Sequence, residues 1–368
     1  MPKKNKADTA RIDNLKKAMK RESHYITNIL QFAFSVLING GTYTQVSLIF
    51  LSINIVPPCS PGFHRASKKV FDVISAMAID SMREYRHLIQ TNEEISIDGS
   101  YSHRRNPAKC VVSVMSSRMN KVIDCEIVEK GAAGNHDGSS NTMEAVGVRR
   151  ILQRWIEEGF HFETYCHDND GPTRAVFREL YPGATEKLDR NHLIKQFGRI
   201  FQKFNRKNCL RGLKSRLEKW LVTLLYSDFT CLEKEQKWLG AFEHYTTIAS
   251  PFGKAKWNLA NNIDSIRALK ELLNATVFIV RKCSYVASTQ NNECLHSLKV
   301  HFANKLFTFD RSFRCRIFAS ILQMNKPHYW IFEARRRLGL PILSLDTITR
   351  LLSTFAQNMK RKITKSRK

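Results

Sequence analysis

The spacing of hydrophobic and polar residues in the first quarter of the chain is that of α-helices. Apolar side chains recur every three or four positions over 25–37, and Gly40-Gly41 then interrupts the pattern. Thr42 or Thr44 can cap a second helix that continues to residue 51. A group of prolines follows, and a longer amphipathic helix is predicted over 64–87.

The period changes beyond this helix. Ile123, Cys125 and Ile127 alternate with Asp124 and Glu126, as expected of a half-buried strand. A helix is predicted over 141–158, with Ser139 or Ser140 as its cap, and residues 192 to about 285 have an almost wholly helical pattern. Strands are predicted over 95–97, 109–115, 122–128, 160–167 and 184–188.

This order of elements predicts the fold class. Three antiparallel strands, a helix and a further strand that ends at an acid are the order of an RNase H-like α/β domain. We therefore expect an RNase H-like mixed sheet with helices, interrupted by a large all-helical insertion and preceded by a small helical region. The predicted divisions are a helical N-terminal region over 1–90, the first part of the core over 91–206, the insertion over 207–288, the closing helices over 289–340 and a basic tail over 341–368.

Charge indicates the kind of partner. The chain has 368 residues, and its 59 Lys and Arg against 33 Asp and Glu give a formal net charge of +26 that is spread along most of the length. A folded core with such an excess usually faces nucleic acid, because phosphate neutralisation supplies affinity for any sequence. The basic helix over 64–87 either forms a DNA-reading helix-turn-helix with the helix before it or belongs to an ordinary helical bundle.

Cysteine usage and the apolar segments indicate in which cellular compartment the protein is expected. The nine cysteines include no CxxC pair, which indicates reduced thiols inside a cell. The apolar stretch over 26–51 is broken near its middle, so neither half is expected to span a bilayer, and no membrane partner is predicted. The basic residues over 360–368 either form a nuclear address or touch DNA, and we expect a nuclear protein.

Three acids in particular settings suggest the chemistry. Asp98 and Asp168 each follow an apolar strand-like segment, and those two strands are neighbours in an RNase H-like sheet. Glu293 begins a helix, apart from the apolar stripe formed by Leu295, Leu298 and Phe302. Taken alone, each acid is better explained as a solvated surface carboxylate. Together, in a basic protein, they predict a site for two Mg²⁺ or Mn²⁺ ions that act on a phosphodiester.

Nearby residues leave some alternatives open. Asp170 competes with Asp168 as the second metal ligand, although Asp168 directly follows the strand and is preferred. His192 either orients substrate or is a core or capping histidine, and His296 lies one helical turn beyond Glu293, able to contact phosphate. His136 and Asp137 are explained by helix capping, and Glu94 by solvation.

These residues resemble the motifs of Mutator-like transposases, a branch of the DDE transposases. The resemblance covers about residues 40–325 and is most specific over 95–200. One departure is Asp189, which stands where the family commonly has the Cys of a Cys-x-x-His motif, while His192 keeps the histidine. The matching segments are Ile97-Asp98-Gly99-Ser100-Tyr101, Asn135-His136-Asp137-Gly138-Ser139-Ser140 with Met143-Glu144, His167-Asp168-Asn169-Asp170, and Asn292-Glu293 with His296-Ser297.

The resemblance implies a function and a set of site residues. Asp98, Asp168 and Glu293 would be the catalytic and metal-binding residues, with two Mg²⁺ or Mn²⁺ ions as cofactors. The partner would be double-stranded DNA at transposon ends and target, and the protein would form a homo-oligomer, a dimer or larger. Residues that would contact the substrate are His192, His296, Asn292, Arg211, Lys214 and Trp220.

Other functions fit parts of the same pattern. A domesticated, non-catalytic DNA-binding protein could keep the fold, although the presence of all three acids argues against it. An RNase H-like nuclease that cuts RNA–DNA hybrids shares the fold and the metals, and the large helical insertion favours the transposase. A zinc-dependent hydrolase is the weakest alternative, because the chain has no clustered histidine ligands.

Overall fold

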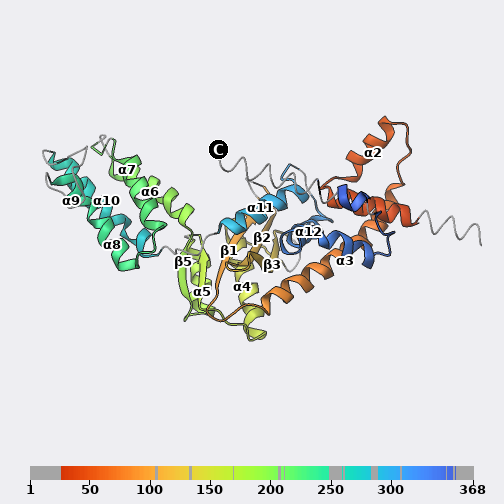
Figure 1. Ribbon diagram of the computed structural model, residues 1–368, viewed down its shortest axis with the longest axis horizontal. Coiled ribbons are helices and arrows are strands. Elements are labelled where there is room, and N and C mark those ends of the chain that lie inside the picture. Colours follow the sequence, from red (N-terminus) through yellow and green to blue (C-terminus); the bar gives the residue numbers. More distant parts are fainter. Residues whose placement is uncertain are drawn as a thin grey trace, which may run out of the picture. The chain divides into compact units, whose positions relative to one another are not determined.

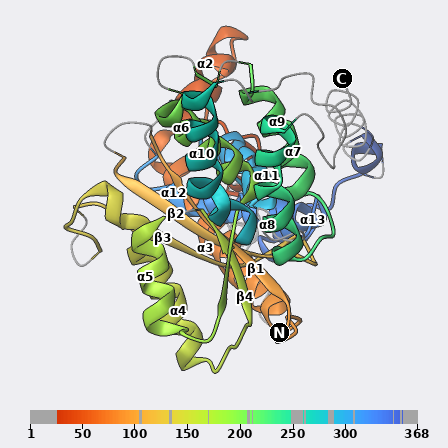
Figure 2. The same ribbon diagram turned by 90° about the vertical axis from the view of Figure 1, so that its left-hand side faces the viewer.

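The computed structural model divides the chain into two compact units. One consists of Met1–Glu84 with Leu295–Lys368, and the other of Tyr85–Cys294. Figure 1 shows the elements along the chain, and Figure 2 shows them turned by 90°. The structure describes residues 26–103, 107–131, 135–168, 170–205, 209–210, 212–247, 259, 262–282, 289–306, 309–344, 346–350 and 353.

The Tyr85–Cys294 unit is built on a five-stranded mixed sheet of order β3-β2-β1-β4-β5. β1 pairs antiparallel with β2, and β2 with β3, whereas β1–β4 and β4–β5 are parallel pairs. This is the RNase H-like sheet that the order of elements predicts, with the first and fourth strands adjacent. The strands are β1 (Glu94–Tyr101), β2 (Lys109–Ser116), β3 (Lys121–Glu129), β4 (Thr164–His167) and β5 (Thr185–Leu188).

Two helices cover one face of this sheet. α4 (Met143–Glu157) and α5 (Gly171–Leu180) pack together against the face that carries Ile95 and Ile97. Trp155 of α4 is fully buried there, and its indole N–H donates a 2.6 Å hydrogen bond to the Asp124 carboxylate on β3. Arg86 and Arg154 pair with the same carboxylate, so the buried charge is compensated.

Several element boundaries differ from the predicted ones. A 3₁₀ turn over Ser140–Thr142 precedes α4, and Ser139 before it makes no side-chain capping hydrogen bond. β4 begins at Thr164 and not at residue 160, because Gly159 at φ +68° and the Phe160 N–H bond to the Trp155 carbonyl close the end of α4 first. The sequence pattern did not predict α5.

The described part of the segment over 192–285 is mainly helical, as predicted, and forms its own hydrophobic core. Phe197, Leu221 and Trp238 are fully buried in it, and the Trp238 indole donates to the Thr276 hydroxyl at 3.2 Å. Asp189 caps the first of these helices directly after β5, the edge strand of the sheet, so the helical insertion follows that strand without a long loop. The helices are α6 (Arg190–Phe204), α7 (Lys214–Leu225), α8 (Cys231–Leu239), α9 (Ala241–Thr246) and α10 (Ile263–Arg281).

In the other unit the first two helices keep close to their predicted boundaries, whereas the third begins at Ser60, about four residues before the predicted start, with Pro61 in its first turn. A helix runs over Ile26–Ile38, and Thr42 caps α2 (Tyr43–Ser52) with a reciprocal capping box to Gln45. The described part of this unit also contains most of α3 (Ser60–Arg86), α12 (Phe313–Asn325), α13 (Tyr329–Arg337) and a helical stretch over 346–350.

Gly40 adopts φ +70°, and a Cβ there would lie 2.1 Å from the His301 carbonyl oxygen, so only glycine fits this turn. Among the described helices none is long and apolar enough to cross a membrane singly. The helices over Ile26–Ile38 and Tyr43–Ser52 pass that test only as a pair bent by 113°. Whether these helices read DNA stays a prediction, and the basic residues over 360–368 lie outside the described part of the chain.

Candidate active site

Asp98 is held in the middle of the sheet. It lies on β1, is buried, and pairs with Ser113 of β2 in the antiparallel ladder. The side chains of a strand alternate between the two faces. Because Ile95 and Ile97 enter the core beneath α4, Ser96 and Asp98 lie on the opposite face. The burial of Asp98 at 9% exposure means that its carboxylate requires polar or cationic partners.

The parallel pairing of β1 and β4 places Asp168 at the same level as Asp98. Ser96 is opposite Cys166 in this ladder, and Asp98 and Asp168 each lie two residues beyond that pair. Asp168 therefore directly follows β4 at the level of Asp98, which lies inside β1 because that strand continues to Tyr101. Neighbouring strands are about 4.8 Å apart, which is within the reach of one metal ion for two carboxylates.

The start of α11 (Gln290–Phe302) is fastened to the Asp98 face of the sheet. The fully buried Asn292 side chain accepts a hydrogen bond from the Ser96 hydroxyl at 2.7 Å and donates to the Ser113 carbonyl at 3.0 Å. Glu293 is the next residue, lies in the first turn and is exposed. The three predicted acids thus come from β1, from the end of β4 and from a helix start bonded to β1 and β2.

A histidine and a buried aspartate stand behind Asp168. The Nδ1 atom of His192 lies 2.5 Å from the Asp168 carboxylate and 3.2 Å from that of Asp189. Contacts with Asp168 first and Asp189 second raise the pKa of His192 to about 10, so this imidazole is protonated at neutral pH. Contact with these two carboxylates is neither of the roles predicted for His192, and contact with the substrate stays a prediction. One ligand atom from each of these three residues lies within 4.8 Å of the others.

Asp189 connects this cluster to α11. It is fully buried, and its two oxygens accept from the N–H groups of Thr289, at 3.0 Å, and His192, also at 3.0 Å. Burial raises the pKa of Asp189, but hydrogen bonds from His192 and from the Thr289 N–H outweigh it and lower the pKa to about 2. Asp189 therefore stays ionised and joins the end of β5, the start of α6 and the start of α11.

Glu144 is a carboxylate of the site that the sequence reasoning did not single out. It belongs to the first turn of α4 and lies against Gly99, where an added Cβ would come within 2.5 Å of its carboxylate. Burial, followed by the nearby Asp170 and Asp168 charges, raises the pKa of Glu144 to about 7. Hydrogen bonds from the Gly99 N–H and the Tyr101 hydroxyl partly oppose this rise in pKa. The available signals were Gly99 directly after Asp98 and the Met143-Glu144 pair.

Asp170 and Asp168 have different surroundings. Asp170 is the N-cap of α5, and its carboxylate accepts from the Thr173 N–H at 2.9 Å. This bond fixes Asp170 as a helix cap, whereas Asp168 faces His192.

The other predicted contact residues are dispersed. Lys214 pairs with Glu218 at 3.7 Å, Trp220 packs on the rings of His244 and Tyr245, and Arg211 lies outside the described residues. His296 belongs to the Leu295–Lys368 unit, where burial, and then the nearby Lys299 and Lys305, lower its pKa. His136 bonds the Ser139 carbonyl and the Thr142 hydroxyl at the start of α4, which is the local role predicted for it.

The residues present suit hard divalent cations. Carboxylate oxygens are the ligands that Mg²⁺ and Mn²⁺ prefer. Asp98 and Asp168 supply them at the same level of neighbouring strands, with Glu293 on the helix fastened there. A zinc site would be expected to have more than the one histidine that this cluster contains.

Comparison with known proteins gives the family. A family model described as Mutator-like transposase matches residues 9–235, more than half of the chain. The match includes Asp98, Glu144, Asp168 and the Asp189–His192 pair, and it ends before Glu293. No curated protein matches the chain. The chain belongs to the Mutator-like transposase family.

Proposed function

We propose that this protein cuts and rejoins DNA at transposon ends by two-metal-ion chemistry, with Asp98, Asp168 and Glu293 as the metal ligands. The observation that carries the proposal is the register of β1 and β4, which sets Asp98 and Asp168 at the same level of neighbouring strands. Asn292 supports the third ligand, because its two hydrogen bonds fasten the residue before Glu293 to Ser96 and Ser113.

The reaction has two displacement steps at phosphorus. In the first, the oxygen of water attacks the scissile phosphate, the bond to the 3′ oxygen breaks, and that oxygen leaves as a free 3′-hydroxyl. In the second, this 3′ oxygen attacks a target phosphate, a new phosphodiester forms, and the target's own 3′ oxygen leaves. Bound Mg²⁺ or Mn²⁺ would supply activation of the nucleophile and neutralisation of charge on the leaving oxygen.

The protein's own groups account for the positioning. Asp98 is held by the ladder between β1 and β2, and the protonated His192 fixes the direction of the Asp168 carboxylate. Asp189 holds His192 and the start of α11 together, so the second and third ligands have one common support. Such rigid support for ligand side chains is what metal sites require for affinity and geometry.

The DNA partner and the setting follow from charge and family. The net charge of +26 suits a long contact with double-stranded DNA. We further propose a nuclear protein that works as a homo-oligomer, a dimer or larger, since two transposon ends must be brought together.

A cleavage and strand-transfer assay with the DNA that flanks the gene tests the proposal. The full chain should nick and join this DNA in Mg²⁺ or Mn²⁺, and Asp98→Asn should reduce the rate by about a thousandfold or more. Asp228→Asn, an exposed acid before α8, is the matched control and should act like the wild type. Binding of Mn²⁺, followed by electron paramagnetic resonance, should weaken in Asp98→Asn and Asp168→Asn but not in the control.

The same assay separates the alternatives. Metal-independent DNA binding with no cleavage would leave a DNA-binding protein without catalysis. Cleavage confined to RNA–DNA hybrids would identify a nuclease instead.

A further inference from the structure

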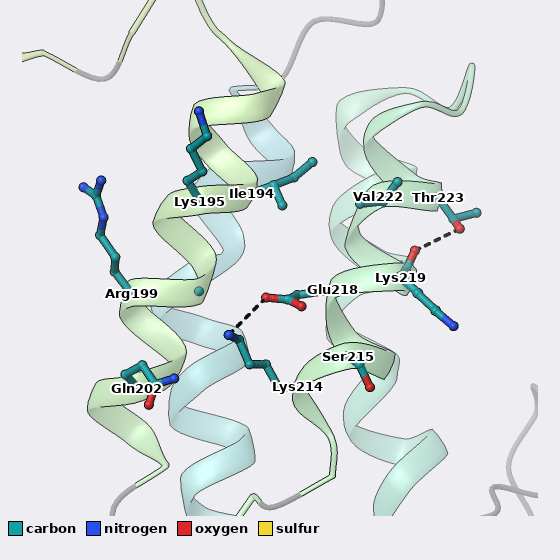
Figure 3. A pocket seen from close by; sticks show the side chains of 11 residues that line it. Ile194, Lys195, Arg199, Gln202, Lys214, Ser215, Glu218, Lys219, Val222 and Thr223 are labelled. Atoms are coloured by element: carbon teal, nitrogen blue, oxygen red, sulfur yellow. Dashed lines mark hydrogen bonds and ion pairs between the residues drawn. The ribbon is translucent and has the colours of Figure 1, made fainter. Parts of the chain in front are cut away.

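An open groove of about 1060 Å³ runs between α6 and α7 in the helical insertion. Figure 3 shows that Lys195 and Arg199 project from α6 on one side, while Lys214 and Lys219 belong to α7 on the other. Ile194, Gly198 and Val222 form the apolar part of its lining. The groove therefore has cations at its rims, and its base is apolar except for the Glu218 carboxylate, which lies near Gly198 and is paired with Lys214.

The cationic side of this groove begins at the candidate active site. Residues three, four and seven positions apart share a face of an α-helix. His192, Lys195 and Arg199 have this spacing on α6, and Gln202 continues it. His192 touches the Asp168 carboxylate at 2.5 Å, so one face of α6 leads from that acid into the groove.

The cations of the groove are available for an outside partner. Within the described part of the chain, no carboxylate forms an ion pair with Lys195, Arg199 or Lys219, and both α6 residues are exposed. Lys214 alone has a partner, Glu218 at 3.7 Å, a separation at which an exposed pair contributes little. Because no acid in the described structure forms an ion pair with the other three cations, a polyanion that entered the groove would not have to displace an acid from them.

We propose that this groove binds the backbone of double-stranded DNA that flanks the scissile phosphate. The inference rests on the proposed function, which places the reacting phosphate beside Asp168. From His192 to Gln202 the helix rises by about 15 Å. Phosphates of one DNA strand advance by about 3.4 Å along the duplex axis, so this face spans roughly four base pairs. The α6 cations fit successive phosphates over that distance and make no demand on base sequence.

Gly198 makes the base of the groove accessible. It lies between Lys195 and Arg199 in the sequence, and a Cβ at this position would meet only the Glu218 carboxylate, at an ordinary 3.6 Å. A larger side chain here would therefore enter the groove without strain in the backbone. Because glycine weakens a helix interior by about 1 kcal/mol relative to alanine, its replacement is not expected to destabilise α6.

The first experiment removes charge. Binding of the full chain to a fluorescent duplex is measured from about 50 to about 200 mM salt without divalent metal. Lys195→Gln with Arg199→Gln should weaken binding at least about tenfold at the lower salt and reduce the slope of log affinity against log salt by about two. Arg267→Gln with Lys270→Gln, two exposed cations of α10 that do not line the groove, removes equal charge and should change both quantities much less.

The second experiment blocks the groove at constant charge. Gly198→Phe should weaken duplex binding about tenfold, whereas Gly198→Ala should bind like the wild type, with thermal unfolding confirming that both variants are folded. Equal affinity of Gly198→Phe and Gly198→Ala, or equal salt slopes for the two double variants, would overturn the inference. Loss of binding to duplex RNA with no loss for duplex DNA would also overturn it.

Asp98→Asn makes the two proposals separable. It should abolish cleavage and keep the groove's DNA affinity. If the wild type never cleaves DNA but the groove variants lose affinity as stated, the groove inference stands and the catalytic proposal fails.

Discussion

Ser96 and Asn292, 196 positions apart in the sequence, form a 2.7 Å hydrogen bond between the serine hydroxyl and the asparagine side-chain oxygen. Both side chains are fully buried. The contact fixes the start of α11 over β1, two residues from Asp98, and the asparagine NH₂ group completes it by donating to the Ser113 carbonyl. A buried amide with both its oxygen and its nitrogen bonded in this way has a defined orientation, and so does the turn that carries Glu293.

The first prediction concerns this asparagine. Asn292→Ala leaves the Ser96 hydroxyl and the Ser113 carbonyl without these partners and should lower the unfolding free energy by about 1–3 kcal/mol. Cleavage should fall more than about tenfold, because the start of α11 is no longer held over β1. Urea unfolding and single-turnover cleavage measure the two effects.

The neighbouring residue is the control. Asn291 bonds the exposed side chain of Asn120, so Asn291→Ala should change both stability and rate little. If Asn292→Ala were as active as Asn291→Ala, the α11 start would not be positioned by this contact.

A second prediction uses Gly99. A Cβ at this position would lie 2.5 Å from the Glu144 carboxylate, so Gly99→Ala must displace either Glu144 or the end of β1. We expect a loss of about 1–3 kcal/mol in stability from this overpacking, together with a lower cleavage rate. Removing the obstructing carboxylate in Gly99→Ala with Glu144→Ala should restore stability relative to Gly99→Ala alone. A double-mutant cycle with no coupling between the two positions would contradict the contact.

The third prediction is a pH dependence of stability that comes from Glu186. Burial raises the pKa of this carboxyl, but hydrogen bonds from His167, Lys282 and Arg174 outweigh it and hold the pKa far below the ordinary 4.5. A depressed carboxyl pKa stabilises the fold above the unfolded value and loses that contribution as the pH falls. The unfolding free energy should therefore decrease from about pH 5 downward.

A neutral variant isolates this effect. Glu186→Gln should cost roughly 1.5–3 kcal/mol at neutral pH and should flatten the acid limb of the stability curve, as followed by urea unfolding. If the unfolding free energy fell equally steeply with decreasing pH in the wild type and in Glu186→Gln, other carboxylates would be responsible for the pH dependence.

The sheet and the first helices could be predicted because their signals are local. The alternation through Cys125 on β3 and the capping chemistry of Thr42 are properties of a few neighbouring residues. α5 was missed although Asp170 and Pro172 are a cap and an early proline, signals that are typical of a helix start. The acids of this run also suit a metal site, and that role alone is predicted for them from the sequence.

The site could be predicted only in part, because its remaining contacts depend on packing between distant segments. Glu144 approaches Gly99 through the position of α4 on the sheet, and no spacing rule places it there. His192 reaches Asp168 because β5 lies beside β4, and Asp189 reaches Thr289 across 100 positions. The contacts of His192 and Asp189 depend on the order of the strands in the sheet. Sequence patterns predict that order but not which side chains it brings into contact.

The last prediction concerns Asp189, the link between the second and third acids. Asp189→Asn keeps an oxygen that can accept from the Thr289 N–H but removes the buried negative charge beside His192. The pKa of His192 should fall from its raised value, because one of its two carboxylate partners is lost. Nuclear magnetic resonance titration of the imidazole measures this shift directly.

Catalysis should respond differently from DNA affinity. In Asp189→Asn, His192 is held less firmly against Asp168, so the cleavage rate should drop by about ten- to a hundredfold. Losses of this size are typical when a residue that supports a metal ligand is replaced. Binding to duplex DNA should stay within about twofold of the wild type, since Asp189 is fully buried and is not among the residues that line the groove. A variant that lost affinity and rate together, with an unshifted His192 pKa, would show that Asp189 acts only through the general stability of the fold.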